Sequence, residues 1–131
     1  MEQSYLPSVS PIGTGGNRDT VLIVEDEPLI AWTVEDDLTD AGYNVVVATN
    51  ADQALELLES RSDITTVFTD VDMPGTLDGL KLSACVSRRW PQLKIIITTG
   101  KQPPDPTHMP KGSTFLPKPY LVDQLRAAIA A

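Results

Sequence analysis

Acidic residues stand at the ends of two apolar runs in this chain of 131 residues. Glu25 and Asp26 directly follow the first run, and Asp70 ends a later one. Carboxylates that lie close together raise one another's pKa unless a cation joins them. Oxygen ligands of this kind suit a hard divalent ion, Mg²⁺ before Ca²⁺.

Hydroxyl and amine groups stand at two further run ends. Thr98 and Thr99 close an isoleucine-rich run, and Lys118 follows the last short run. A lysine neutralises carboxylates or contacts a transferred phosphoryl group, and a threonine hydroxyl can donate to a phosphoryl oxygen. A carboxylate nucleophile, a metal and a cationic clamp are what phosphoryl transfer to a carboxylate requires. Each residue alone also suits a helix cap, a turn or the surface, so the coincidence of all of them carries the interpretation.

Alternating elements must bring these residues together. Apolar runs predict strands at 21–24, 43–48, 64–70, 93–98 and 114–116, and amphipathic patterns predict helices at 28–38, 51–60, 80–90 and 121–130. Such alternation indicates an α/β fold with a parallel sheet covered on both faces. Right-handed crossovers place all the strand C-terminal ends at one edge, where ligands of such sheets bind.

Two segments depart from this alternation. Residues 1–19 are rich in glycine, proline and serine without an apolar period, which predicts a disordered N-terminal tail before a domain at 20–131. Between 100 and 113 lie four prolines, which remove backbone donors and clash with a preceding helical turn. We therefore expect a loop with at most one short turn in place of a helix there.

Composition excludes several functions. The net charge of −8 argues against direct binding to nucleic acid, which needs clustered lysine and arginine. One cysteine and one histidine exclude an internal disulfide and a cysteine–histidine metal site. No apolar run approaches the roughly 20 residues of a membrane span, and no signal peptide opens the chain. We expect a soluble, cytoplasmic protein without a membrane partner.

Five segments, taken in order, resemble one known family. They are VLIVEDEP (21–28), VFTDVDMPG (67–75), DGL (78–80), IIITTG (95–100) and FLPKPY (115–120). Together they are similar to the receiver domains of two-component response regulators, in the CheY-like superfamily, over residues 20–131. The resemblance implies a flavodoxin-like, doubly wound sheet of five parallel strands in the order 2-1-3-4-5, with helices on both faces.

The resemblance also implies roles for the acidic residues. Asp70 is the expected phosphoacceptor, which takes a phosphoryl group from a histidine kinase or histidine phosphotransferase. Glu25, Asp26 and Asp70, with the backbone carbonyl of Asp72, are the expected ligands of Mg²⁺.

The remaining roles fall on the last two strands. Lys118 is the expected clamp, joined to Pro119 by a cis peptide bond, and Phe115 holds the position of an aromatic switch. Counting along the strand favours Thr99 over Thr98 as the switching hydroxyl, because small Gly100 follows it. Neighbouring strand residues point to opposite faces, so only one of the two can reach Asp70.

Two details differ from the common pattern of this family. The turn at 73–77 is one residue longer than usual. Asp72 is acidic and Lys101 is basic, so we hypothesise that these side chains pair and shield the phosphoryl group from water.

The function expected from these residues is that of a signalling receiver, either stand-alone or cut from a longer protein. It catalyses only its own phosphorylation and slow dephosphorylation, and it switches a surface that binds a downstream protein. A phosphatase of the haloacid dehalogenase type, suggested by the Asp70–Asp72 spacing, is one alternative. A receiver-like module that binds partners without phosphorylation is the other.

Overall fold

The structure, a computed structural model, describes residues 19–72 and 78–131 of the chain, so the predicted tail and the turn at 73–77 lie outside the described residues, apart from Asp19. The elements are β1 (Thr20–Val24), α1 (Pro28–Asp40), β2 (Asn44–Ala48), α2 (Ala51–Ser60), β3 (Ile64–Asp70), α3 (Gly79–Arg89), β4 (Lys94–Thr99), η1 (Pro106–His108), β5 (Thr114–Pro117) and α4 (Val122–Ala130). Each predicted strand and helix is confirmed, with ends that differ by at most two residues.

The five strands form one parallel sheet in the order β2-β1-β3-β4-β5. The order reverses at β1, because the chain first adds β2 on one side and then returns to add β3 on the other. The predicted flavodoxin-like, doubly wound fold is therefore confirmed. In such a sheet the strand ends at the reversal point form the usual binding edge.

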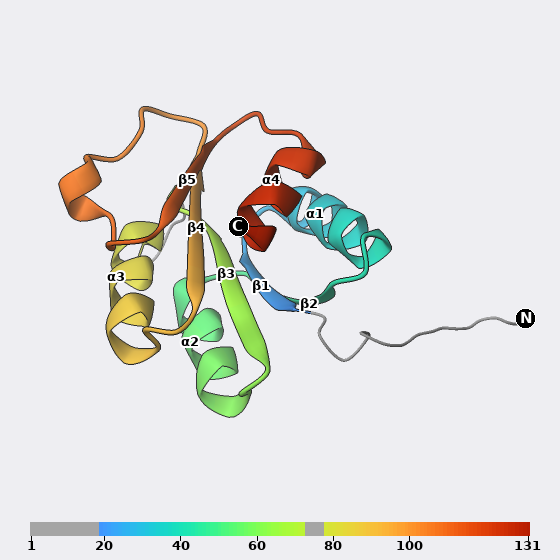
Figure 1. Cartoon of the computed structure of the whole chain (residues 1–131), viewed down its shortest axis with the longest axis horizontal. Helices are drawn as coiled ribbons and strands as arrows, with labels where there is room; N and C mark the ends of the chain where they lie inside the picture. The colour runs from blue at the N-terminus through green and yellow to red at the C-terminus, as the bar shows by residue number, and fades with distance from the viewer. Residues whose placement is uncertain (1–18, 73–77) are drawn as a thin grey trace, which may run out of the picture.

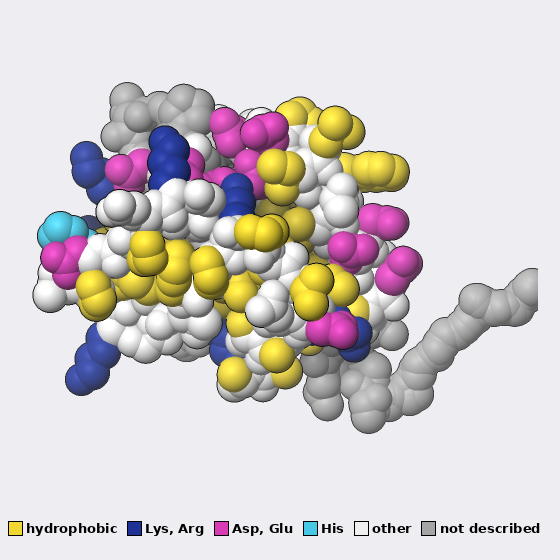
Figure 2. All heavy atoms as spheres, turned by 90° about the horizontal axis from the view of Figure 1, so that it is seen from above, with side chains coloured by type: hydrophobic (Ala, Val, Ile, Leu, Met, Phe, Trp, Pro, Cys, Tyr) yellow, Lys and Arg dark blue, Asp and Glu magenta, His cyan; other side chains and the backbone are white. Residues whose placement is uncertain are grey.

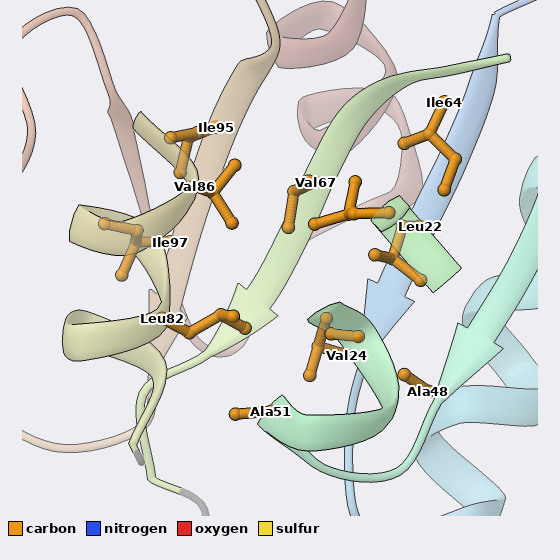
Figure 3. Packing of buried hydrophobic residues seen from close by; sticks show 12 residues of the cluster. Leu22, Val24, Ala48, Ala51, Ile64, Val67, Leu82, Val86, Ile95 and Ile97 are labelled. Atoms are coloured by element: carbon orange, nitrogen blue, oxygen red, sulfur yellow. The ribbon is translucent and has the colours of Figure 1, made fainter. Parts of the chain in front are cut away.

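Helices cover both faces of the sheet (Figure 1). Helices α2 and α3 lie on one face and α1 and α4 on the other, each with its own buried apolar cluster. Figure 3 shows the cluster on the α2–α3 face, where Leu82 and Val86 of α3 lie close to Val67 and Ile97 of the sheet. Val21 to Val24 are at most 1% exposed because β1 lies inside the sheet and is covered from both sides.

Local signals explain where the helices begin and end. Pro28 occupies the first turn of α1, where its missing N–H costs nothing. The side chains of Asn50 and Asp78 accept the free backbone N–H groups at the starts of α2 and α3. Gly42 follows α1 at φ +100°, a left-handed conformation that favours glycine.

The segment from Gly100 to Ser113, which we call the proline loop, replaces a helix as the sequence predicts. Its regular structure is limited to the three-residue turn η1, whose start is capped by the Asp105 carboxylate. Met109 of the loop and Phe115 of β5 are partly buried against the cluster on the α2–α3 face. The proline loop thus adds to the cover that α2 and α3 give this face of the sheet.

None of the helices within the described ranges is long and apolar enough to cross a lipid bilayer.

Candidate functional site

The C-terminal edge of the sheet gathers the predicted acidic residues and the lysine. Asp70 ends β3, Glu25 follows β1, and Lys118 follows β5. The Lys118 Nζ lies 2.6 Å from Asp70 Oδ2 and 3.8 Å from Glu25 Oε1. In Figure 2, which looks onto this edge from above, acidic and basic side chains gather together, with exposed hydrophobic side chains beside them. The sequence-based prediction that these three residues converge is confirmed.

Burial sets the electrostatics of this group. Asp70 is 4% exposed and Glu25 is 5% exposed. Burial raises the pKa of the Glu25 carboxyl to about 7, and the charge of Asp70 adds to the rise, while the Glu27 N–H and Lys118 oppose it. Burial alone would lower the pKa of Lys118, yet its hydrogen bond to Asp70 and the nearby carboxylates raise it. Lys118 is therefore held as a cation between two buried acids.

Backbone donors orient both carboxylates. The N–H of Asp72 donates to Asp70 Oδ1 at 2.8 Å, and the N–H of Glu27 donates to Glu25 Oε2 at 3.2 Å. The two oxygens of Asp70 thus have different partners, an N–H on Oδ1 and the Lys118 ammonium on Oδ2. This arrangement presents the Asp70 carboxylate in one orientation at the edge.

Helix α3 begins against the backbone of the same residue. A Cβ added to Gly79 would lie 2.1 Å from the Asp70 carbonyl oxygen and 2.6 Å from the Val71 Cα. Only glycine permits this approach. The first turn of α3 therefore packs directly beneath the acidic residue.

The donor set fits a hard divalent cation. Two buried carboxylates face one lysine, so the site carries an uncompensated negative charge that a cation would offset. All the side-chain atoms here that could bind a metal are carboxylate oxygens, the ligands that Mg²⁺ prefers. Over residues 19–72 and 78–131, however, no three acidic, histidine or cysteine side chains already form a metal cage. Asp26, half-buried beside Glu25, and the backbone of Asp72 would have to complete the coordination.

The strand register separates the two threonines. Asp70 pairs with Thr98 across β3 and β4, so their side chains share one face of the sheet. Thr99 points to the other face, and its Oγ1 donates to Asp72 Oδ2 at 2.5 Å. The two threonines therefore lie on opposite faces of β4, and the choice of Thr99 as the switching hydroxyl stays a prediction.

The Thr98 hydroxyl is also unusual in its surroundings. Thr98 is 2% exposed, and its Oγ1 is buried without a hydrogen-bond partner in the described structure.

Asp72 and Lys101 do not form the predicted shielding pair. The Asp72 carboxylate accepts from Thr99 instead, and the contact of Lys101 with this group is its backbone N–H, which donates to Thr99 Oγ1 at 3.1 Å. The Lys101 side chain is exposed. The pairing hypothesis overlooked the threonine because it considered charges alone.

Phe115 lies on the face opposite to Asp70. It pairs with Ile97 in the register and is half-buried against the cluster on the α2–α3 face. The next strand residues lead to the peptide bond between Lys118 and Pro119, which is cis as predicted.

An apolar groove beside the acidic edge was not found from the sequence. It has a volume of about 600 Å³ and runs between α1 and the start of α4, with Leu29, Ile30 and Val122 in its wall and Lys118 at its end. Leu29, Trp32 and Leu121 are 76%, 64% and 71% exposed. Large exposed apolar side chains on the elements that form a groove commonly mark a binding surface. The spacing of the apolar residues Leu29 and Trp32 on one helix was the sequence signal that could have predicted an apolar surface here.

Comparison with known proteins places the chain among regulators. Residues 21–130 match the family described as the response regulator receiver domain. The DNA-binding transcriptional regulator NtrC of Escherichia coli is 32% identical over 116 residues, which are 86% of this chain and 24% of NtrC. A putative NtrX-like response regulator of Rickettsia felis is 37% identical over 81 residues, 61% of this chain and 17% of that protein. The chain thus spans about a quarter or less of the length of these relatives.

Solved structures show the same similarity. A response regulator receiver protein from Sinorhizobium medicae has a TM-score of 0.81 at 27% identity, over 87% of this chain and 93% of that one. A receiver domain protein from Clostridium thermocellum has a TM-score of 0.78 at 28% identity, over 86% and 91% of the two chains.

Proposed function

Because the chain belongs to the response regulator receiver domain family, we propose that Asp70 accepts a phosphoryl group from the phosphohistidine of a histidine kinase or phosphotransferase. An oxygen of the Asp70 carboxylate attacks phosphorus, the P–O bond forms, and the P–N bond to the imidazole breaks. The imidazole nitrogen keeps the electron pair of that bond. The product is an aspartyl phosphate, which water later hydrolyses.

One observation carries this proposal. The Lys118 ammonium lies 2.6 Å from an oxygen of the buried Asp70 carboxylate and is also close to Glu25. A carboxylate so buried is accessible to a reactant only at the C-terminal ends of the strands. The lysine is placed to stabilise the negative charge that develops there during the reaction. Glu25, Asp26, Asp70 and the Asp72 carbonyl would hold Mg²⁺, which when bound neutralises the charge of the transferred phosphoryl group.

Thr99 is the hydroxyl that we propose for contact with the phosphoryl group. Its Oγ1 donates to Asp72 Oδ2 at 2.5 Å, and the N–H of Asp72 donates to Asp70 Oδ1. These bonds support the proposal because they place the Thr99 hydroxyl at the edge that holds the acceptor. Phe115 keeps the proposed role of an aromatic switch that turns inward after phosphorylation and alters the surface offered to a downstream protein.

The phosphodonor would dock on the apolar groove between α1 and the start of α4. The groove ends at Lys118, so a partner seated on Leu29 and Leu121 would carry its histidine to Asp70. We propose a cytoplasmic location and protein partners, without direct contact to nucleic acid or membrane.

The test is intact mass after incubation with acetyl phosphate and Mg²⁺, run beside Asp70→Asn. We expect the parent to gain one phosphate and Asp70→Asn to gain none. Steady hydrolysis of a phosphate monoester would instead favour a phosphatase. A folded parent that gains no phosphate from acetyl phosphate or a panel of histidine kinases would favour a phosphorylation-independent binding module.

A matched pair of variants tests the assignment of the hydroxyl. Thr98→Val and Thr99→Val remove the same group from adjacent residues of β4. We expect Thr99→Val to slow phosphorylation by acetyl phosphate about tenfold, and Thr98→Val to change the rate less than twofold. The reverse order would give the role to Thr98.

A further inference from the structure

The groove between α1 and the start of α4 is large and apolar. Its volume of about 600 Å³ lies within the range of roughly 300–1,000 Å³ that ligand pockets have. Ile30 and Leu125 are among its lining residues, and Leu29 and Leu121 are 76% and 71% exposed. Burial of apolar surface that meets water is favourable, so the groove favours an apolar occupant.

The charge around the groove argues against a second copy of the chain as this occupant. Asp37 lines the groove, and Asp36 and Asp40 are exposed on the same helix. The last turn of α1 holds no basic residue, and the whole chain carries a net charge of −8. Two copies that faced each other through α1 would bring these carboxylates together, and like charges repel. An uncharged segment is therefore favoured.

The N-terminal segment, residues 1–18, contains such a sequence within the same chain. Residues 3–17 have no charged side chain, and they include the apolar residues Leu6, Val9 and Ile12. The prolines of this segment have no backbone N–H, so they can be buried without a hydrogen-bond partner for that group. Its composition thus matches the apolar walls of the groove.

The point at which the chain enters the sheet allows this segment to reach the groove. The Asn44 N–H donates to the Asp19 carbonyl at 3.1 Å, which places the end of the segment at the start of β1. The groove lies along α1, whose 13 residues extend about 20 Å from the opposite edge of the sheet. The seven residues 12–18 span up to about 23 Å when extended, so the residues before them can lie in the groove.

We propose that residues 5–12 occupy the groove between α1 and α4, with Leu6 and Ile12 as the main apolar contacts. Because the segment and the groove belong to one chain, the effective concentration is in the millimolar range and weak contacts suffice. A phosphodonor that docks on the groove would then have to displace the segment. That consequence rests on the proposed function, whereas the docking itself does not depend on phosphorylation.

The test is NMR spectroscopy of the full chain, with the parent beside the double variant Leu6→Ser, Ile12→Ser. In the parent we expect nuclear Overhauser effects between methyl groups of Leu6 or Ile12 and those of Leu29 or Leu125. In the variant, the amide signals of the residues that line the groove should shift, while those of α2 and α3 stay in place and show that the chain is folded. Absence of the Overhauser effects, with groove signals equal in both proteins, would overturn the proposal.

Matched variants identify the two contact surfaces. Ser8→Ala and Ser10→Ala change polar residues of the same segment and should leave the groove signals unchanged. Leu29→Ser changes an exposed side chain of the groove, so the signals of residues 5–12 should move towards those of a synthetic peptide of residues 3–17. Signals of residues 5–12 that stay as in the parent would count against the groove as the docking site.

Dilution and the same peptide separate the remaining outcomes. Contacts within one chain give groove signals that stay constant between about 1 mM and about 20 µM protein, whereas signals that move on dilution would assign the groove to a second copy and overturn the proposal. Added to the variant Leu6→Ser, Ile12→Ser, the peptide should shift the groove signals with a dissociation constant of about 1 mM, and a peptide with both serines should not. A chain that shows these contacts but gains no phosphate from acetyl phosphate would count against the proposed function and not against the docking.

Discussion

The two edges of the sheet use similar charged residues in opposite ways. At the C-terminal edge, Glu25 and Asp70 are almost fully buried and share one lysine. At the N-terminal edge, Arg61 forms two hydrogen bonds with Asp63, and Arg89 pairs with Glu59 at 2.7 Å, all with side chains 37% to 53% exposed. The C-terminal edge thus keeps an excess of negative charge buried. At the N-terminal edge, each of these two exposed acids has its own arginine partner in contact with water.

The burial of a charged residue therefore indicates a functional site better than its residue type does. Removing charge from water costs free energy, and a fold keeps such a group when its chemistry requires it. The exposed pairs have little effect on stability, because water already solvates both partners. Four predictions test this contrast, in order of decreasing effect.

The largest effect is expected from glycines at the two edges. Gly79→Ala places a Cβ against the Asp70 carbonyl and should lower the free energy of unfolding by about 3 kcal/mol or more. Gly42→Ala, near the N-terminal edge, meets no atom within 4 Å and suffers only from its positive φ, at about 1 kcal/mol. Urea unfolding measures both, and equal losses would show that the close approach at Asp70 is easily relaxed.

Cation binding should distinguish the acids. Mg²⁺ at a hundred times its dissociation constant should stabilise the parent by about 2.7 kcal/mol, since it binds only the folded chain. Glu25→Gln should lose most of this gain, and Glu59→Gln, from the opposite edge, should keep it. Thermal unfolding with Mg²⁺ and with EDTA gives the comparison. Equal stabilisation of the two variants would place the cation away from the buried acids.

The pKa of the Tyr120 phenol responds to the negative charges at the C-terminal edge. Burial, with the charges of Glu25, Asp70 and Asp37, raises its pKa to about 12. The folded chain then holds the phenol proton more tightly than the unfolded chain, whose tyrosine titrates near 10, so stability falls as pH rises from about 10 to 12. At pH 11 the loss is about 1 kcal/mol after allowance for partial exposure. Unfolding of Tyr120→Phe should lack this component of the pH dependence.

The smallest effect is expected at the N-terminal edge. The hydrogen bond from Arg61 holds the pKa of Asp63 at about 2, which favours the folded state above pH 4 and is lost as pH falls towards 2. Both side chains are exposed, so Arg61→Gln should leave the urea midpoint at pH 7 unchanged within experimental error, at low and at high salt. A clear loss of stability would mean that the balanced edge contributes more than its exposure indicates.

The sequence predicted the fold well because its signals are local. Pro28, Asn50 and Asp78 mark helix starts by their own backbone and side-chain chemistry, and apolar runs mark buried strands. The proline loop followed from the same logic, since proline excludes a helix whatever surrounds it.

The site was predicted less completely because orientation is not local. Glu25, Asp70 and Lys118 converge as expected, since all three follow parallel strands. Thr98 and Thr99 differ only in the face on which each lies, and that depends on the register with β3. The Thr99–Asp72 bond joins residues 27 positions apart, which no count along one strand reveals.

The two tryptophans of the chain lie in different regions of the molecule. Trp32 is 64% exposed on α1, the helix that forms one wall of the groove, whereas Trp90 follows α3 and is stacked under Arg89 at 4.4 Å. Their fluorescence therefore provides a built-in signal and a built-in reference. A partner that covers the groove would shift the emission of Trp32 to shorter wavelength and shield it from a soluble quencher, while Trp90 keeps its spectrum. Binding to the proposed docking groove can thus be followed without attaching a dye to its side chains.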